Sequence, residues 1–189
     1  MQAASDAEPS GMTSIMGADL DTVEGICAAV RQEGGIVCVA NLNSPGQIVI
    51  SGAQAAVDTA SARLMEAGAR RAIPLAVAGA FHSPLMAPAS EGLSEKLANT
   101  EIRPATIPVI ANVKAGPVSD PDEIRSALVA QLVNPVLWEK SMHLLASEVV
   151  EQFVEPGPGR VLAGLMKKIN RQATVVGYPD AGSVGKEEA

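Results

Sequence analysis

Aromatic side chains, basic charge and long apolar runs are all scarce in this sequence of 189 residues. Only one Trp, one Tyr and two Phe are present, which argues against a protein that stacks nucleic acid bases on aromatic rings. The formal net charge of −7 argues against non-specific binding of DNA or RNA, which depends on a stripe of Lys and Arg along the nucleic acid backbone. No apolar run is long enough to cross a bilayer, and residues 1–6 lack the basic start and apolar stretch of a signal peptide. These absences predict a cytoplasmic protein with neither a nucleic acid nor a membrane partner.

Cysteine is equally scarce, with Cys27 and Cys38 as a single pair among apolar neighbours. The pair has neither the CxxC spacing of a metal site nor a secretory context, so we expect two buried free thiols and no metal site. Apolar residues make up 47% of the chain, enough to bury a core of aliphatic side chains. The sequence therefore predicts a globular protein.

Residues 11–77 have the pattern of a compact mixed unit, in which apolar periodicity alternates between that of strands and that of helices. The predicted elements are a strand at 12–16, a helix at 19–31, a hairpin of strands at 36–42 and 47–51, a helix at 54–67 and a strand at 70–77. The turn Ser44-Pro45-Gly46 joins the two hairpin strands. This βαββαβ order is that of a ferredoxin-like unit, which packs two helices on one face of its sheet.

After residue 77 the pattern changes to strands that alternate with helices. The predicted elements are a helix at 86–97, a buried strand at 107–110, helices at 121–132 (N-capped by Asp120) and 135–146, a strand at 150–154, a helix at 160–169 and a strand at 174–177. Such alternation predicts a parallel α/β sheet, although three strands make an incomplete one. We assign residues 78–178 to this larger subdomain and residues 179–189 to a tail.

His82 is one of two histidines and stands in the segment GAFHSPLM, residues 79–86. A histidine between a strand end and a proline-led helix start is typical of a catalytic base. Such a base acts on a nucleophile, yet the sequence contains no Gly-x-Ser-x-Gly elbow. His143 lies within a predicted helix and is expected to serve packing or the surface.

Four segments together resemble the malonyl-CoA:acyl-carrier-protein transacylases. They are residues 41–52 (NLNSPGQIVISG), 81–86 (FHSPLM), 131–138 (QLVNPVLW) and 155–162 (EPGPGRVL). The resemblance runs from Met1 to about Arg171 and covers only the C-terminal part of the family. The Gly-Gln-Gly-x-Gln loop, the Gly-His-Ser-Leu-Gly elbow and the malonyl-binding arginine of the family are not in this sequence. Because Met1-Gln2 resembles the Met-Gln that follows that arginine, we expect the chain to begin just past it.

The resemblance implies a ferredoxin-like subdomain inserted in an incomplete parallel-sheet α/β, hydrolase-like acyltransferase domain. It also implies transfer of a malonyl group from malonyl-CoA, through a serine ester, to the phosphopantetheine thiol of acyl carrier protein in fatty acid biosynthesis, without a cofactor of its own. His82 matches the catalytic histidine, and Gln131 matches the position whose backbone carbonyl orients that histidine. Asn41 and Asn43, which border the cleft of the family, and Phe81, beside the histidine, are candidate substrate contacts. Hydrogen bonds to the nearby turn are the competing interpretation for the two asparagines.

Lys167, Lys168 and Arg171 close the helix predicted at residues 160–169. Cations at a helix C-terminus suit the helix dipole, which is the simplest interpretation of the three. A local basic patch also attracts an acidic partner, so they are candidate docking residues for acyl carrier protein. The glycines of residues 157–159 resemble an anion-binding helix start, and the family resemblance makes this turn structural.

Three interpretations follow from these features. The chain is the C-terminal portion of a malonyl transacylase, one subunit of a split acyltransferase completed by an N-terminal fragment of the same enzyme, or a non-catalytic module that binds acyl carrier protein or acyl groups. The presence of His82 argues against the third, because a binding module needs no base. The isolated chain is expected to be inactive, since loss of a nucleophile typically costs about a millionfold in turnover.

Overall fold

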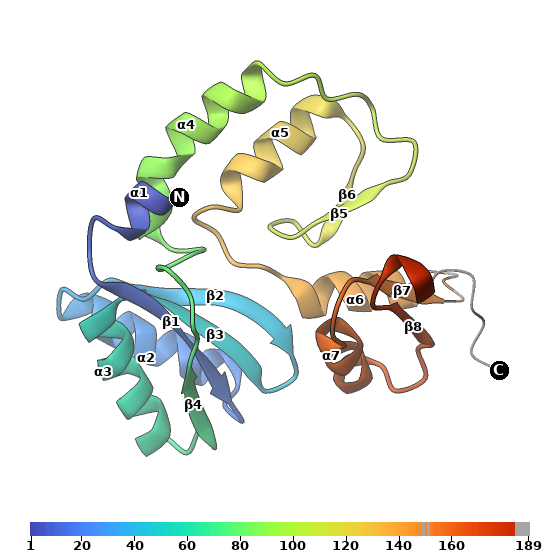
Figure 1. Ribbon diagram of the computed structural model, residues 1–189. Coiled ribbons are helices and arrows are strands. Elements are labelled where there is room, and N and C mark those ends of the chain that lie inside the picture. Colours follow the sequence, from blue (N-terminus) through green and yellow to red (C-terminus); the bar gives the residue numbers. More distant parts are fainter. Residues whose placement is uncertain (149, 151, 184–189) are drawn as a thin grey trace. The chain divides into compact units, whose positions relative to one another are not determined.

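The computed structural model describes residues 1–148, 150 and 152–183 of the chain (Figure 1). The described residues fall into two compact units, Met1–Ser141 and a second unit that begins at Met142. Helix α6 (Trp138–Ser147) starts in the first unit and ends in the second. This division differs from the subdomain boundary after residue 77, which stays a prediction.

The first unit contains an antiparallel four-stranded sheet, which has two helices on one of its faces (Figure 1). Its elements are β1 (Ser10–Met16), α2 (Leu20–Gln32), β2 (Val37–Ser44), β3 (Gln47–Ala53), α3 (Gln54–Glu66) and β4 (Arg71–Pro74). The strands lie in the order β2-β3-β1-β4, and each neighbouring pair is antiparallel. This is the ferredoxin-like βαββαβ arrangement that the sequence predicted.

Local signals in the sequence explain where these elements begin and end. Asp19 caps α2, because its carboxylate accepts a hydrogen bond from the Thr22 N–H at 2.8 Å. β4 is shorter than the predicted strand at 70–77 and ends at Pro74, which has no N–H to donate. The chain turns soon afterwards, where the Val77 N–H donates to the Leu75 carbonyl at 2.9 Å.

The face of the sheet that α2 and α3 cover holds the main core. Its buried side chains are Ile15, Val23, Cys27, Val30, Val37, Val39, Ile48, Ile50, Ala56, Val57, Ala60, Leu64 and Ala69. Each fully buried Val, Ile or Leu side chain contributes roughly 1.5–3 kcal/mol to folding, relative to the same side chain exposed to water. The sheet is therefore a stable base for the segments that lie on its other face.

The other face of the sheet supports the segment that carries His82. Met12, Ala40 and Val49 are buried there, and Phe81 packs against them. Both cysteines are free thiols, but only Cys27 is buried. The expectation of two buried thiols is therefore wrong for Cys38, which is half-buried because it stands on the edge strand β2.

Val136 extends this sheet beyond β2. Its N–H donates to the Ala40 carbonyl at 2.8 Å, and its carbonyl accepts from the Leu42 N–H at 2.9 Å. Asn41 and Val136 form an isolated parallel bridge. The helix predicted at 135–146 accordingly starts only at Trp138, because the backbone before it is extended and paired with β2.

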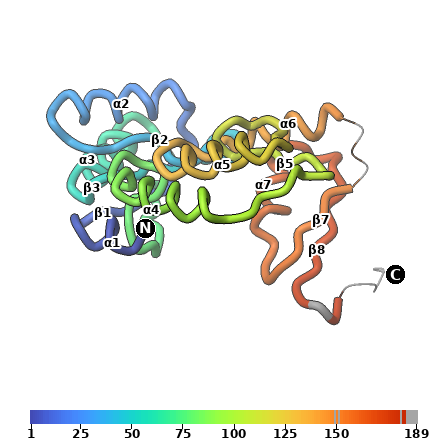
Figure 2. Tube along the Cα trace, turned by 90° about the horizontal axis from the view of Figure 1, so that it is seen from above, coloured from blue at the N-terminus to red at the C-terminus, as the bar shows by residue number. Residues whose placement is uncertain are grey.

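The remainder of the first unit is helical, apart from one small hairpin. Its elements are α1 (Gln2–Ser5), the 3-10 helix η1 (Pro84–Met86), α4 (Ala87–Ala98), β5 (Val109–Ala111), β6 (Gly116–Val118) and α5 (Pro121–Ala130). Helices α4 and α5 pack against each other and lie side by side in both views (Figure 1, Figure 2). α5 ends two residues before the predicted Leu132.

The strand predicted at 107–110 departs most from expectation. It forms at Val109–Ala111 and pairs antiparallel with β6, which the sequence did not predict. A tight turn reverses the chain between the two strands, since the Ala115 N–H donates to the Ala111 carbonyl at 2.8 Å. The expectation of burial is wrong, because Ile107 is 79% and Val109 is 52% exposed.

The second unit contains a βαβ segment. β7 (Phe153–Pro156) pairs in parallel with β8 (Val175–Tyr178), and α7 (Val161–Ile169) connects them. The parallel pairing expected from the sequence thus holds for this pair. The strand predicted at 150–154 forms later in the chain, and residue 151 lies outside the described residues.

The tail predicted at 179–189 begins with the short 3-10 helix η2 (Ala181–Ser183), and residues 184–189 lie outside the described residues. The structure is an α/β fold with several small sheets. Across residues 1–148, 150 and 152–183, we find no helix that is both long and apolar enough to span a membrane.

Candidate active site

His82 lies in a tight turn between β4 and η1. The Ser83 hydroxyl donates to the Ala80 carbonyl at 2.7 Å and accepts from the Leu85 N–H at 3.3 Å, so it closes the turn and caps η1. Pro84 follows at the first position of η1, where its missing N–H is not needed. The backbone at His82 is in the left-handed region, with φ +59°. His82 therefore adopts a backbone conformation that is uncommon for a residue other than glycine.

The imidazole ring of His82 is held by the backbone of Gln131. Its Nδ1 atom lies 2.7 Å from the Gln131 carbonyl oxygen, at the C-cap of α5. A carbonyl oxygen only accepts hydrogen bonds, so Nδ1 carries the proton and donates it. In the neutral ring the lone pair is then on Nε2. The structure thus brings His82 and Gln131 together in an arrangement that leaves one ring nitrogen able to accept a proton.

A second contact fixes the Gln131 side chain. Its Oε1 atom accepts a hydrogen bond from the Asn112 Nδ2 atom at 3.3 Å. Asn112 follows β5 and lies at the start of the turn to β6. The orienting residue of the histidine is therefore itself tied to the small hairpin.

His82 lines a mostly apolar cavity of about 500 Å³. The lining residues are Met1, Phe81, His82, Met86, Leu93, Leu128, Gln131 and Leu132. They come from the chain start, the His82 turn, α4 and the end of α5, and Figure 1 shows the N-terminus beside α4. His82 and Gln131 are the polar members of this set, so the cavity joins a proton acceptor to an apolar space of the size that small ligands occupy.

The predicted substrate contacts divide into two groups. Phe81 is half-buried and lines the cavity next to His82. Asn41 and Asn43 lie on β2, partly buried, and they are not among the lining residues. Among the described residues, neither asparagine side chain hydrogen-bonds to the turn, so the expected Asx-type hydrogen bonds are absent.

Cys38 is a site residue that the sequence did not indicate. Its thiol lies 3.6 Å from the His82 carbonyl oxygen and 3.6 Å from the Ser51 carbonyl oxygen. Burial raises the pKa of the Cys38 thiol to about 11, so the thiol stays protonated near neutral pH and can donate a hydrogen bond. Alternation along β2 placed Cys38 and Ala40 on the same face, but only the fold shows that His82 lies above them.

The glycine turn at residues 157–159 begins α7, and an internal carboxylate fills its anion-binding position. Glu155 is buried, and its two carboxylate oxygens accept from the Leu162 and Ala163 N–H groups at 2.8 and 2.9 Å. A carboxylate at a helix N-terminus satisfies free amides and suits the helix dipole. The turn is therefore structural, and the buried glutamate is the signal that identifies it.

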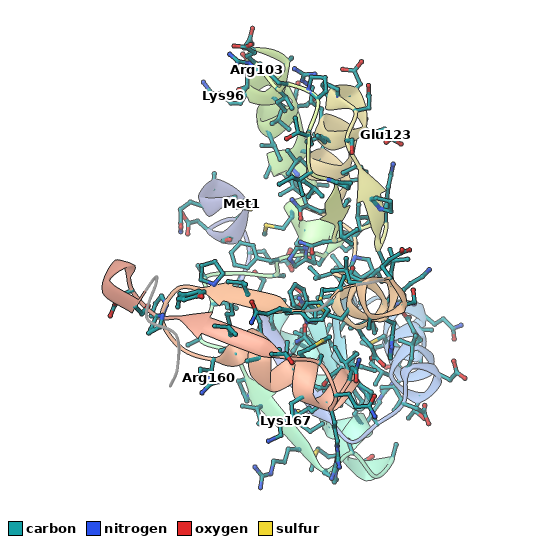
Figure 3. All side chains as sticks on the ribbon, turned by 90° about the vertical axis from the view of Figure 1, so that its right-hand side faces the viewer. Met1, Lys96, Arg103, Glu123, Arg160 and Lys167 are labelled. Atoms are coloured by element: carbon teal, nitrogen blue, oxygen red, sulfur yellow. The ribbon has the colours of Figure 1, made fainter. Side chains whose placement is uncertain are left out.

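The predicted docking residues lie at the other end of α7. Lys167 and Lys168 are in its last turn, Arg171 follows it, and all three are exposed. Figure 3 shows Lys167 and Arg160 near opposite ends of this helix. Among the described residues, no cluster of His, Cys, Asp and Glu side chains could hold a metal ion. His143 is exposed on α6.

Comparison with known proteins places this site in context. The sequence model of the acyl transferase domain matches residues 10–187. The malonyl CoA-acyl carrier protein transacylase of Bacillus subtilis is 44% identical over 182 residues, which cover 95% of this chain and 57% of that protein. The enzyme of the same name from Haemophilus influenzae is 41% identical over 188 residues, which cover 60% of its length.

Solved structures agree with the sequence relatives. An acyl carrier protein S-malonyltransferase from Vibrio cholerae matches with a TM-score of 0.91 and 40% identity, over 97% of this chain and 60% of that one. A malonyl-transacylase solved in complex with a type II PKS acyl-carrier protein matches with the same TM-score and 39% identity, over 96% of this chain and 59% of its own. The chain thus spans less than two thirds of the length of the relatives that it matches.

Proposed function

Because the chain belongs to the acyl transferase domain family, we propose that it takes part in malonyl transfer from malonyl-CoA to the phosphopantetheine thiol of an acyl carrier protein, in fatty acid biosynthesis. The observation that supports this function most directly is the 2.7 Å contact between His82 Nδ1 and the Gln131 carbonyl, at the wall of an apolar cavity. The names of its relatives supply the substrate and the partner.

In the proposed reaction His82 moves one proton in each direction. Nε2 takes the proton of a serine hydroxyl as the serine oxygen bonds to the thioester carbon. The imidazolium then protonates the sulfur of coenzyme A, which leaves as a thiol and yields a malonyl-serine ester. In the second half-reaction His82 accepts the proton of the phosphopantetheine thiol and returns it to the departing serine oxygen. No net proton is consumed, and this chain needs no cofactor of its own.

The Gln131 carbonyl stabilises the charged ring between these two proton transfers. Its dipole points at Nδ1–H, so it favours the imidazolium and keeps Nε2 facing the reacting groups. A neutral carbonyl stabilises the imidazolium less than a carboxylate would.

Phe81 supports a role in acyl-group binding, since it lines the same cavity as His82. Asn41 and Asn43 are proposed as substrate contacts on the family resemblance alone. Lys167, Lys168 and Arg171 are proposed to dock the carrier protein, because exposed cations at the end of one helix attract an acidic surface.

The serine nucleophile in this proposal must come from outside the 189 residues. We infer that the chain alone transfers no acyl group and that a polypeptide with the Gly-His-Ser-Leu-Gly elbow completes the site. Intact mass spectrometry tests both points, after incubation of the chain with malonyl-CoA, alone and with an N-terminal polypeptide that carries the serine. The expected result is a malonyl adduct on the added polypeptide only in the mixture.

Two histidine variants make this experiment specific. His82→Ala should reduce the acylation rate by at least about a thousandfold, as the loss of a triad member does. His143→Ala removes the other histidine, which is exposed on α6, and should leave the rate unchanged. If the mixture yields no adduct while the chain is well folded, a binding module without catalysis becomes the better interpretation.

A further inference from the structure

The backbone of His82 is held in a conformation that costs energy. A non-glycine residue with φ +59° is strained, and such a conformation persists only where its surroundings enforce it. Three contacts surround this position. The Ser83 hydroxyl closes the turn at Ala80, the Gln131 carbonyl holds the ring, and the Cys38 thiol faces the His82 carbonyl oxygen at 3.6 Å.

Cys38 is the one of these residues that links the turn to the sheet. It stands on β2, and the residues on either side of it, Val37 and Val39, are buried in the helix-covered core. Among the described residues, we find no other hydrogen-bond donor to the His82 carbonyl. The thiol has one proton and two carbonyls in reach, those of His82 and Ser51, so it donates to one or shares the proton between them.

We propose that Cys38 is a positioning residue for His82: its thiol holds the His82 carbonyl against the sheet while the Gln131 carbonyl holds the ring. The two anchors act on opposite ends of one residue, the backbone and the side chain. Loss of the thiol frees the carbonyl, lets φ relax from the left-handed region and moves the ring away from Gln131. This inference rests on the proposed role of His82 as the base, but its first test needs no catalysis.

Nitrogen-15 NMR of the imidazole is that first test, because it reports which ring nitrogen carries the proton. With only two histidines in the chain, His143→Gln assigns both signals. At a pH where the ring is neutral, His82 in the wild-type chain should be mainly the Nδ1–H tautomer. Cys38→Ala should convert it to a mixture of tautomers, and Cys38→Ser, which restores a hydroxyl donor, should recover most of the Nδ1–H form.

Cys27→Ala is the matched control. This variant also removes one cysteine thiol, but from the core on the other face of the sheet, where Cys27 is fully buried. Because Cys27 has no contact with His82, its loss should leave the tautomer of His82 unchanged even if the fold is weakened. Circular dichroism checks that each variant is folded. If Cys38→Ala fails to fold, Cys38→Val replaces it as a variant without a donor.

The second test uses the chain completed by the serine-bearing polypeptide. Cys38→Ala should lower kcat about fivefold with little change in KM, the effect of one weak hydrogen bond on a positioned base. An unchanged tautomer in Cys38→Ala, or a Cys38→Ser variant that behaves like Cys38→Ala, would overturn the proposal. A failure of malonyl transfer in the wild-type mixture would instead count against the proposed function and leave the NMR result standing.

Discussion

The buried thiol of Cys27 should make the stability of the first unit fall at alkaline pH. Burial raises the pKa of this thiol from 9.0 to about 12, with the charge of Glu24 as a smaller cause. The side chain is 0% exposed and packs in the core beneath α2 and α3. The folded protein therefore keeps the proton in a pH range where the unfolded chain releases it.

The sign and size of the effect follow from this difference. Between pH 9 and pH 12 the unfolded state binds fewer protons than the native state, so the free energy of unfolding decreases as the pH rises. Below pH 9 the thiol is protonated in both states, so the folded protein keeps its full stability there. At pH 10 an unfolded thiol with a pKa of 9.0 is about ten-elevenths ionised, which favours the unfolded state by about 1.4 kcal/mol relative to pH 7.

Urea unfolding curves under reducing conditions, followed by far-UV circular dichroism, measure this contribution. Wild type and Cys27→Ala are compared at pH 7 and pH 10. The difference in unfolding free energy between them should shrink by about 1.4 kcal/mol at the higher pH, because the variant lacks the titrating group. Val23→Ala, which opens a cavity in the same core without removing a thiol, should keep a constant difference from wild type. A constant difference for Cys27→Ala would refute the reasoning.

Three further predictions concern stability and docking. Gly52→Ala should destabilise the sheet by more than about 3 kcal/mol in urea unfolding, because its Cβ would overlap the Ile36 carbonyl oxygen. Gly92→Ala on α4, whose Cβ would have nothing within 4 Å, should instead be neutral or stabilising. Glu155→Ala should speed hydrogen exchange of the Leu162 and Ala163 amides by about 10- to 100-fold, and equal rates would exclude the cap. The pair Lys167→Glu and Lys168→Glu should slow acyl transfer to the carrier about tenfold at low salt but not acylation by malonyl-CoA, with Lys96→Glu on α4 as the control.

Local patterns were sufficient for most of the first unit. Apolar periodicity and the turn at Pro45-Gly46 predicted every helix and strand of the four-stranded sheet, since each depends on neighbours in the sequence. The same reasoning predicted a strand at Val109 but not its exposure or its antiparallel partner, and it wrongly predicted a helix at Val136. Val109 lies in a hairpin that a tight turn creates, and Val136 is extended because it pairs with β2. Both outcomes depend on partners that a local pattern does not contain.

The candidate site shows the same contrast between local and distant information. His82, Phe81 and the segment beginning at Gln131 stood out in the sequence because a family resemblance marked them. Cys38 did not stand out, because its importance lies in a 3.6 Å approach to a residue 44 positions away. Glu155 was marked only as part of a glycine-rich motif, and its hydrogen bonds to α7 show what that motif does.

The sequence by itself determined the order of the helices and strands along the chain in the four-stranded unit and the Asp120 cap of α5, because these depend on side-chain type and spacing, and its resemblance to a family marked His82. Only the tertiary structure decided which ring nitrogen of His82 is free, because that depends on the Gln131 carbonyl arriving 2.7 Å from Nδ1 at the end of another helix. It also decided that the thiol of Cys38 faces the His82 backbone. Hydrogen bonds require a donor and an acceptor at a defined distance, and the fold alone sets that distance between residues far apart in the chain.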